Sequence, residues 1–333
     1  MSAGAGESAR DRALTYLERR GWPGALLVEL QGDASTRCYF RAVLSARTEV
    51  LLVEAPGEEK RLEPFLANAA FLEEQGLAPP RVLDHAADLG IVSLEDLGDV
   101  SLRGALAFAT SAATRQALFA AALTALVRLQ TSATAALHEG VAAFHVRFDE
   151  AVFLRELHMF AERYLRDLAG VKLRGGAVKP FEESLLWIAR RLAAAPAVLT
   201  HRDYHIDNLF VTEGRLRLID FQDARFGPAS YDPASLLNDR DVHRFLEPAD
   251  GERLLERFVA TRGLDPDAFR SEYRLAVVQR GLKAVGTFAD QAQRRGRKHY
   301  LEFISPTLDR VRAAAAGIEE LRPILRTLDK ATS

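Results

Sequence analysis

The change from strand patterns to helix patterns near residue 100 is the feature that most limits how this chain of 333 residues can fold. Before that point, short runs rich in apolar and β-branched residues, separated by Gly, Pro and Asp, predict five strands. The expected strands lie at 25–30, 38–43, 50–54, 81–86 and within 89–99. A helix at 8–20, opened by a Ser8 and Asp11 capping box, and another at 62–75 complete a small α+β lobe.

After Ser101 the apolar spacing becomes helical, and the length of the chain suggests about two domains. Helices are predicted at 102–108, 115–130, 149–168, 181–194, 251–262, 269–294 and 307–325, with strands returning only at 209–211 and 216–219. The predicted fold class is therefore α+β, with a small antiparallel-sheet N-lobe at 1–98 and a mainly helical C-lobe at 99–333.

The segment HRDYHIDN, residues 201–208, is followed after one hairpin by RLRLIDFQDA. Magnesium-dependent phosphoryl transfer needs a base that orients the acceptor hydroxyl and oxygen ligands that hold the metal. We assign Asp203 as the base and Asn208 and Asp220 as the metal ligands, because amide and carboxylate oxygens suit Mg²⁺. Alone, Asp203 could cap nearby backbone and Asn208 could be a turn residue, but the combination in this order favours a kinase.

Other polar residues of the two motifs receive secondary roles. His201 and Arg202 are interpreted as structural support for the loop. His205 could contact phosphate or make a local hydrogen bond. Gln222 and Asp223 could contact an acceptor, or could belong to a solvated loop after the strand.

Two backbone segments of the N-lobe are candidates for nucleotide binding. In GDASTR, the small residues Gly32, Ser35 and Thr36 would let N–H groups approach phosphate oxygens. Taken alone, this motif is more typical of an ordinary tight turn. The hinge-like loop after the last strand could read an adenine edge through the backbone of Glu95 and Leu97.

Charge and cysteine content exclude several classes of protein. The net charge is −2 with both signs interspersed, so no basic face for nucleic acid is indicated and small-molecule partners are favoured. The single Cys38 excludes an intrachain disulfide. No signal peptide and no membrane-spanning run is recognised, which predicts a cytoplasmic enzyme.

Five motifs together resemble the aminoglycoside phosphotransferase and choline kinase superfamily: GDASTRCYFR, SLEDLGD, HRDYHIDN, LIDFQDARFGP and YDPASLL. The chain looks closest to the bacterial N-acetylmuramate/N-acetylglucosamine anomeric kinases, whose C-terminal helices residues 279–304 also resemble. The resemblance implies a bilobal protein-kinase-like fold and transfer from ATP, with Mg²⁺, to the C1 hydroxyl of an N-acetylated amino sugar in cell-wall recycling. It also implies that Asp232 supports the catalytic loop.

Two other functions stay open. One is a kinase of the same fold for an aminoglycoside or another metabolite, which a strongly acidic acceptor site would favour. The other is a nucleotide-binding module without catalysis. The oligomeric state is not predicted.

The sequence departs from the superfamily at two positions. Most relatives carry a phosphate-binding lysine near the end of the third strand, where this chain has Glu54. Arg37 and Arg41, beside the proposed phosphate loop, are the candidate replacements, since guanidinium binds phosphate bidentately and stays charged. Asp207 stands where the sugar kinases commonly have a basic residue.

Overall fold

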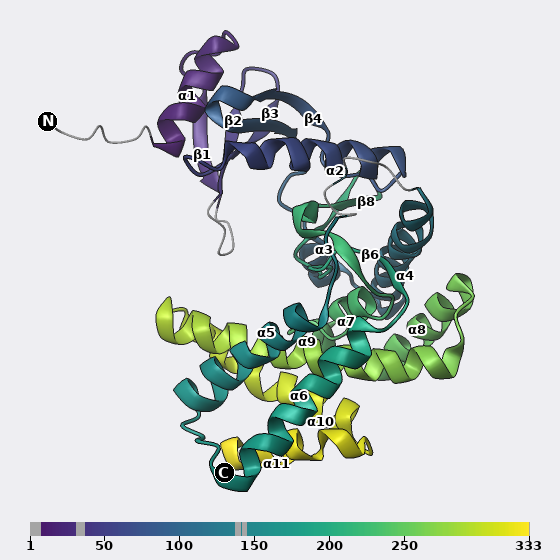
Figure 1. Ribbon diagram of the computed structural model, residues 1–333. Helices are drawn as coiled ribbons and strands as arrows, with labels where there is room; N and C mark the ends of the chain where they lie inside the picture. The colour runs from purple at the N-terminus through teal and green to yellow at the C-terminus, as the bar shows by residue number, and fades with distance from the viewer. Residues whose placement is uncertain (1–7, 31–36, 137–140, 142–144, 333) are drawn as a thin grey trace, which may run out of the picture. The chain divides into compact units, whose positions relative to one another are not determined.

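The structure is a computed structural model that describes residues 8–30, 37–136, 141 and 145–332 (Figure 1). The chain forms two compact units. The first contains the chain up to Ser101 together with Leu209–Gln222, and the second contains most of the remainder, including Ala143–Asn208 and the chain from Asp223 onward. The two sequence motifs are therefore divided between units, because the hairpin that joins them packs with the first.

A five-stranded antiparallel sheet in the order β1-β2-β3-β5-β4 forms the first unit. Its strands are β1 (Leu26–Leu30), β2 (Cys38–Val43), β3 (Thr48–Val53), β4 (Val82–Ala86) and β5 (Ile91–Glu95). The five predicted strands are confirmed. Alternating apolar residues identify such strands well, because one face of the sheet is buried.

Helix α1 (Ala9–Arg19) packs on one face of this sheet (Figure 1). The predicted capping box is present, with the Asp11 N–H donating to Ser8 Oγ at 3.1 Å. Tyr16 of α1 lies in one apolar cluster with Phe40 of β2 and Leu51 of β3. Because strand side chains alternate between faces, the neighbouring Tyr39 belongs to the opposite face of the sheet.

Helix α2 (Leu62–Glu74) and a hairpin of β7 (Leu209–Thr212) and β8 (Arg215–Leu218) complete the first unit. Phe65 of α2 stacks on Phe221, just after the hairpin, with ring centroids 5.0 Å apart. A β-bridge between Ser101 and Phe210 connects the hairpin to the segment after β5. These contacts hold the second motif against the sheet and α2.

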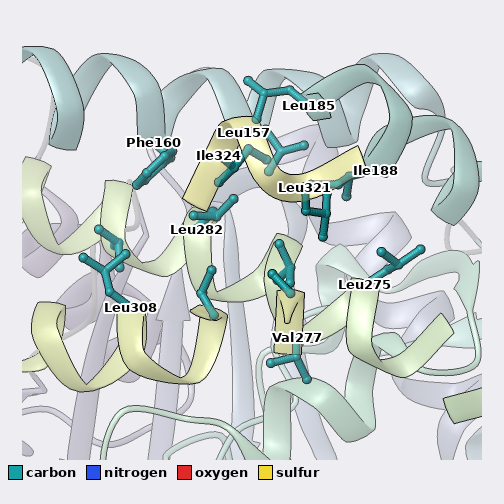
Figure 2. Close-up of a cluster of buried hydrophobic side chains, with 14 of the residues drawn as sticks. Leu157, Phe160, Leu185, Ile188, Leu275, Val277, Leu282, Leu308, Leu321 and Ile324 are labelled. Atoms are coloured by element: carbon teal, nitrogen blue, oxygen red, sulfur yellow. The ribbon is translucent and has the colours of Figure 1, made fainter. Parts of the chain in front are cut away.

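The second unit is mainly helical, and a large apolar cluster joins several of its helices (Figure 2). Side chains such as Leu157, Leu185, Leu282, Leu308 and Ile324 come from five different helices and are fully buried. Burying one such side chain contributes about 2 kcal/mol, so the core holds the helices firmly. The helices are α3 (Leu102–Phe108), α4 (Ala112–Arg128), α5 (Glu150–Phe160), α6 (Val178–Ala193), α7 (Tyr231–Leu237), α8 (Pro248–Arg262), α9 (Pro266–Arg294), α10 (Ile304–Ala315) and α11 (Arg322–Thr332).

One pair of strands in the second unit was not predicted. Strands β6 (Ala197–Thr200) and β9 (Arg225–Pro228) pair antiparallel, so the expectation that strands return only at 209–211 and 216–219 is wrong. The sequence RFGP of β9 contains Gly and Pro, which are rare in strands. Gly227 is required by packing, because a Cβ there would lie 2.6 Å from the Phe148 ring.

Two predicted helices differ in the structure. The helix expected at 307–325 is wrong as a single element: α10 ends at Ala315, and Gly317, with φ of 78°, precedes the start of α11. The helix expected at 149–168 is continuous but changes from α to π geometry after Phe160. At that residue Gly286 of α9 approaches the backbone so closely that a Cβ would lie 2.9 Å from it.

Candidate active site

The loop 203–208 follows β6 in the second unit and carries Asp203, the predicted base. Its backbone folds tightly on itself: the Asp203 carbonyl accepts from the His205 N–H at 3.1 Å, and the His205 carbonyl accepts from the Asn208 N–H at 3.0 Å. The Asn208 amide nitrogen donates to the Asp203 carbonyl at 3.0 Å and lies 3.2 Å from His205 Nε2. Because the amide nitrogen points into the loop, the amide oxygen is on the opposite side of the group.

Asp232, at the start of α7, holds the backbone immediately before Asp203. Its carboxylate accepts from the His201 N–H at 2.6 Å and from the Arg202 N–H at 3.0 Å. Asp232 is fully buried, and burial raises the pKa of its carboxyl to about 7, although both N–H groups favour the charged form. These contacts are the ones that a supporting role requires.

Arg280, Lys283 and Arg202 act electrostatically on Asp203 without a close ion pair to its carboxylate oxygens. Arg280 Nη1 lies 3.9 Å from Asp203 Oδ1, and 31% of the Asp203 side chain is exposed. Burial acts to raise the pKa of this carboxyl, but Lys283, Arg280 and Arg202 together hold it below its usual range. Asp203 is therefore ionised at neutral pH, as an acceptor of a hydroxyl proton must be.

Helix α9 supplies two of those cations. Arg280 donates to the Arg202 carbonyl at 2.9 Å, to the Tyr231 hydroxyl at 3.0 Å and to Ser235 Oγ at 2.5 Å, and its guanidinium lies over the Tyr231 ring. The bond to Arg202 joins the guanidinium to the segment before Asp203, and the other two bonds join it to α7. Sequence reasoning assigned no role to Arg280 or Lys283, although it singled out residues 279–304 as a family-like segment.

Glu156 of α5 is a further site residue that sequence reasoning missed. Its carboxylate accepts from Gln279 at 2.8 Å and from Lys283 at 3.1 Å, and lies 3.7 Å from Arg202. Burial favours the neutral acid, but the pKa of Glu156 is lowered overall, with Lys283 the main cause. No local spacing marks Glu156, because its partners come from α9 and from the loop before Asp203.

Arg202 and Asp223 form an ion pair at 3.1 Å, and about half of the Asp223 side chain is exposed. The Arg202 backbone has φ of 78°, a region that non-glycine residues rarely adopt. Such strain is typical of functional sites, where the surrounding structure maintains it. His201, by contrast, is buried, and its ring makes a T-shaped contact with the ring of Tyr204.

Asp207 is held by arginines. Arg103 of α3 approaches it at 2.5 Å and Arg240 at 2.9 Å. Burial raises the pKa of Asp207, but Arg103 outweighs it and the pKa is lowered. His205, Asp207 and Asp239 also place ligand atoms within 4.8 Å of one another. Arg103 pairs with both carboxylates, and Arg240 pairs with Asp207, so these ion pairs connect α3 to the loop 203–208.

In the first unit, Asp220 and Gln222 follow strand β8. Gln222 donates a hydrogen bond to the Asp220 carboxylate. The Asp220 backbone has φ of 63°, so the second motif carries the same kind of backbone strain as the first. The stack of Phe221 on Phe65 holds this turn in place.

The candidate phosphate-binding cations have different partners. Arg37 Nη2 lies 2.7 Å from Glu54 Oε1. Arg41 instead pairs with Asp96 at 2.7 Å and Asp99 at 2.8 Å, after the end of β5. Glu54, which stands where most relatives have a lysine, is therefore the ion-pair partner of Arg37.

The predicted hinge residues are held by the β7–β8 hairpin. The Leu97 carbonyl accepts from the Thr212 hydroxyl at 3.1 Å, and Glu95 pairs with Arg217 at 2.5 Å. This pair lowers the pKa of Glu95 to about 2. Three predicted phosphate-loop residues, Gly32, Ser35 and Thr36, lie outside the described residues.

Asn208 of the second unit and Asp220 of the first unit each have a side chain of a type that fits a magnesium ion. Both offer hard oxygen ligands, the kind that Mg²⁺ takes from proteins alongside phosphate oxygens and water. The Asn208 amide donates into the loop through its nitrogen, so the oxygen, which is the atom a metal would take, is not part of that bond.

Comparison with known proteins identifies the family of the chain. Residues 27–273 match the model of the phosphotransferase enzyme family. A protein from Neisseria meningitidis is 32% identical over 302 residues, covering 89% of this chain and 87% of the relative. One from Pseudomonas aeruginosa is 32% identical over 311 residues, covering 90% and 88%. Both are named N-acetylmuramate/N-acetylglucosamine kinase.

The fold is also similar to solved structures. A choline/ethanolamine kinase family protein from Mesorhizobium loti superposes with a TM-score of 0.61 at 17% identity, covering 96% of this chain and 99% of that one. The chain thus has a protein-kinase-like fold and is a phosphotransferase. It belongs to the phosphotransferase enzyme family, as the resemblance of its motifs predicted.

Across the described residues, no helix is both long and apolar enough to cross a lipid bilayer.

Proposed function

We propose that this enzyme transfers the γ-phosphoryl group of ATP to the anomeric C1 hydroxyl of N-acetylmuramate and N-acetylglucosamine, in cytoplasmic recycling of the cell wall. The main support is the shared name of two relatives that are 32% identical over about nine-tenths of the chain. In this proposal residues 1–98 bind the nucleotide, and residues 99–333 carry the catalytic loop and the acceptor-binding helices.

The charge around Asp203 supports a neutral or acidic sugar over a polycation. Three carboxylates, Asp203, Glu156 and Asp223, are interspersed with four cations. The cations are Arg202, Arg225, Arg280 and Lys283. A site with this balance is not strongly acidic, so it does not attract a polycation such as an aminoglycoside, whereas the lactyl carboxylate of N-acetylmuramate is compatible with it. The aminoglycoside alternative is therefore disfavoured.

In the proposed reaction Asp203 orients the sugar hydroxyl and accepts its proton. The acceptor oxygen forms a bond to the γ-phosphorus while the bond from that phosphorus to the bridging oxygen breaks, and ADP leaves with the electron pair. An anomeric hydroxyl is more acidic than an ordinary alcohol, so an ionised carboxylate of low basicity is sufficient when it is well placed. Asp232 and Arg280 provide that placement by binding the N–H and the carbonyl of Arg202, the residue directly before Asp203.

Magnesium, when bound, would neutralise charge on the transferring phosphates. Asn208 and Asp220 are proposed as its protein ligands. The backbone of Glu95 and Leu97 and the loop of Gly32, Ser35 and Thr36 are proposed as the adenine and phosphate contacts. We further propose that His205, Gln222 and Asp223 contact phosphate or sugar.

The assay that tests this function uses purified protein with Mg-ATP and each sugar, with an aminoglycoside panel beside them. Phosphorus NMR then identifies the position of the phosphate. We expect sugar 1-phosphates from both N-acetylated sugars and no phosphorylated aminoglycoside. The methyl glycoside of N-acetylglucosamine is the matched control, because it lacks only the anomeric hydroxyl. Phosphorylation of that glycoside, or of an aminoglycoside alone, would contradict the proposal.

A further inference from the structure

Glu54 and Arg37 lie side by side on one face of the sheet in the first unit. The last paired residues of β2 and β3 are Cys38 and Val53, and Arg37 and Glu54 stand one position beyond them. Because side chains alternate, both belong to the face that α1 does not cover. The two residues are therefore cross-strand neighbours.

The pair is buried and close. Arg37 Nη2 lies 2.7 Å from Glu54 Oε1, with only 7% of the Arg37 side chain and none of the Glu54 side chain exposed. The Arg37 guanidinium lies 5.8 Å from the centre of the Phe65 ring. Burial lowers the pKa of Arg37, but contact with Glu54 outweighs it, so the arginine stays charged.

Glu54 is also anchored through its backbone. Its N–H donates to the Gly90 carbonyl at 2.9 Å, and its carbonyl accepts from Arg12 at 2.5 Å. Arg12 donates in addition to the Leu89 carbonyl at 2.7 Å. These bonds fix the Glu54 backbone from two neighbouring segments, so its carboxylate is a well-anchored partner for the longer arginine side chain.

Phe65 connects this pair to the turn that carries the proposed metal ligand. The Arg37 guanidinium lies beside the Phe65 ring, and Phe65 stacks on Phe221, the residue directly after Asp220, with ring centroids 5.0 Å apart. Arg37 and the turn of Asp220 therefore both pack against the same side chain of α2.

Arg41, the other candidate for binding the nucleotide phosphates, forms ion pairs with two aspartates after β5. Its guanidinium contacts Asp96 and Asp99 at 2.7 and 2.8 Å. It therefore braces the segment after β5.

We propose that Arg37 is the cation that binds the nucleotide phosphates and that Glu54 is the positioning residue that holds it. Protein kinases keep a phosphate-binding lysine of the third strand in place through a glutamate of a helix. In this chain the residue after the third strand supplies the carboxylate, and the residue before the second strand supplies the cation. Glu54 therefore supports nucleotide binding indirectly, because it holds Arg37 in position. A guanidinium has five N–H donors, enough to contact a carboxylate and phosphate together. The inference rests on the proposed use of ATP but not on the proposed sugar.

The test measures the Kd of a non-hydrolysable Mg-ATP analogue by calorimetry, without any acceptor, for Arg37→Gln, Glu54→Gln and the double variant. Arg37→Gln should weaken binding about ten- to a hundredfold, the range for a lost charge-assisted contact. Glu54→Gln should weaken it by a smaller factor. In the Arg37→Gln background, Glu54→Gln should change the Kd by less than about twofold, because Glu54 acts only through Arg37.

Glu49→Gln is the matched control. Glu49 is also a fully buried carboxylate of β3 paired with an arginine, Arg20 at 2.6 Å, but it points to the α1 face. The Glu49→Gln substitution should lower the melting temperature of the protein without changing the Kd of the ATP analogue.

The double variant Arg37→Gln/Glu54→Lys moves the cation to the third strand and should bind the analogue more tightly than Arg37→Gln. Circular dichroism establishes that each variant is folded. A wild-type Kd in folded Arg37→Gln or Glu54→Gln would overturn the inference. It would also be overturned if the fold-change in Kd of the double glutamine variant equalled the product of the two single fold-changes. Failure of wild-type protein to phosphorylate a sugar would contradict the proposed function alone, since this binding test needs no sugar.

Discussion

Asp203 and Glu54 are both carboxylates among arginines, but they meet those arginines in opposite ways. Glu54 has no exposed surface and contacts Arg37 at 2.7 Å. Asp203 is 31% exposed, and its nearest recorded cation stands at 3.9 Å. Direct contact occupies the lone pairs of an oxygen, whereas cations at a distance keep it charged and leave it accessible. The first arrangement suits a residue that positions a neighbour, and the second suits a residue that accepts a proton.

The strongest test of this comparison is Asp203→Asn. Loss of a general base lowers kcat by about 10²- to 10⁴-fold. Nucleotide affinity should remain within a few-fold of wild type, since the proposed phosphate cation lies in the other unit. Single-turnover kinetics and calorimetry measure the two quantities. Asp309→Asn, which removes an exposed carboxylate of α10, serves as the control. A kcat near that of wild type would remove Asp203 from its proposed role.

Asp232 is a third case in this comparison. Like Glu54 it is fully buried and in direct contact with its partners, but these partners are two backbone N–H groups, those of His201 and Arg202. Its folded-state pKa of about 7 exceeds the unfolded value of about 3.9, so between these values only the folded chain binds the proton. Its contribution to stability therefore falls as pH rises through that window, by about 2 to 3 kcal/mol from about pH 5 to pH 7.5.

Asp232→Asn should abolish this step, because an amide does not titrate. Urea unfolding of both proteins at the two pH values measures the difference. Equal pH dependence in wild type and variant would show that Asp232 is already ionised in the folded state.

Lys283→Met tests whether several cations together keep the Asp203 carboxylate ionised. Arg202 and Arg280 remain in this variant, so Asp203 stays ionised at neutral pH. We expect kcat to fall more than twofold but less than tenfold, an effect of about 1 kcal/mol on the barrier. The control is Lys330→Met near the end of α11. A loss as large as that of Asp203→Asn would show that Lys283 acts on the reacting groups directly.

Arg41→Gln is expected to have the smallest effect. It releases Asp96 and Asp99 and should weaken nucleotide binding only about two- to threefold through the loosened segment, much less than Arg37→Gln. Parallel calorimetry of the two variants gives the ranking. The opposite ranking would make Arg41 the phosphate-binding cation.

Local patterns in the sequence were sufficient for the strands of the sheet, the Ser8 cap and helix α2. In each, neighbours along the chain carry the signal, either as alternation over one buried face or as a side chain that bonds backbone three residues away. The strands β6 and β9 escaped prediction because only their partner stabilises RFGP as a strand. The interruption near Gly317 was missed because apolar residues on both sides continue a helical spacing.

The sequence by itself determined the reaction class, since the order of Asp203, Asn208 and Asp220 is carried by two short motifs and their loops. Only the tertiary structure decided which arginine meets Glu54, and that Glu156, Arg280 and Lys283 gather around the catalytic loop. The physical reason is range. Turns and caps depend on residues a few positions apart, whereas ion pairs and pKa shifts depend on distances in space that helix packing sets.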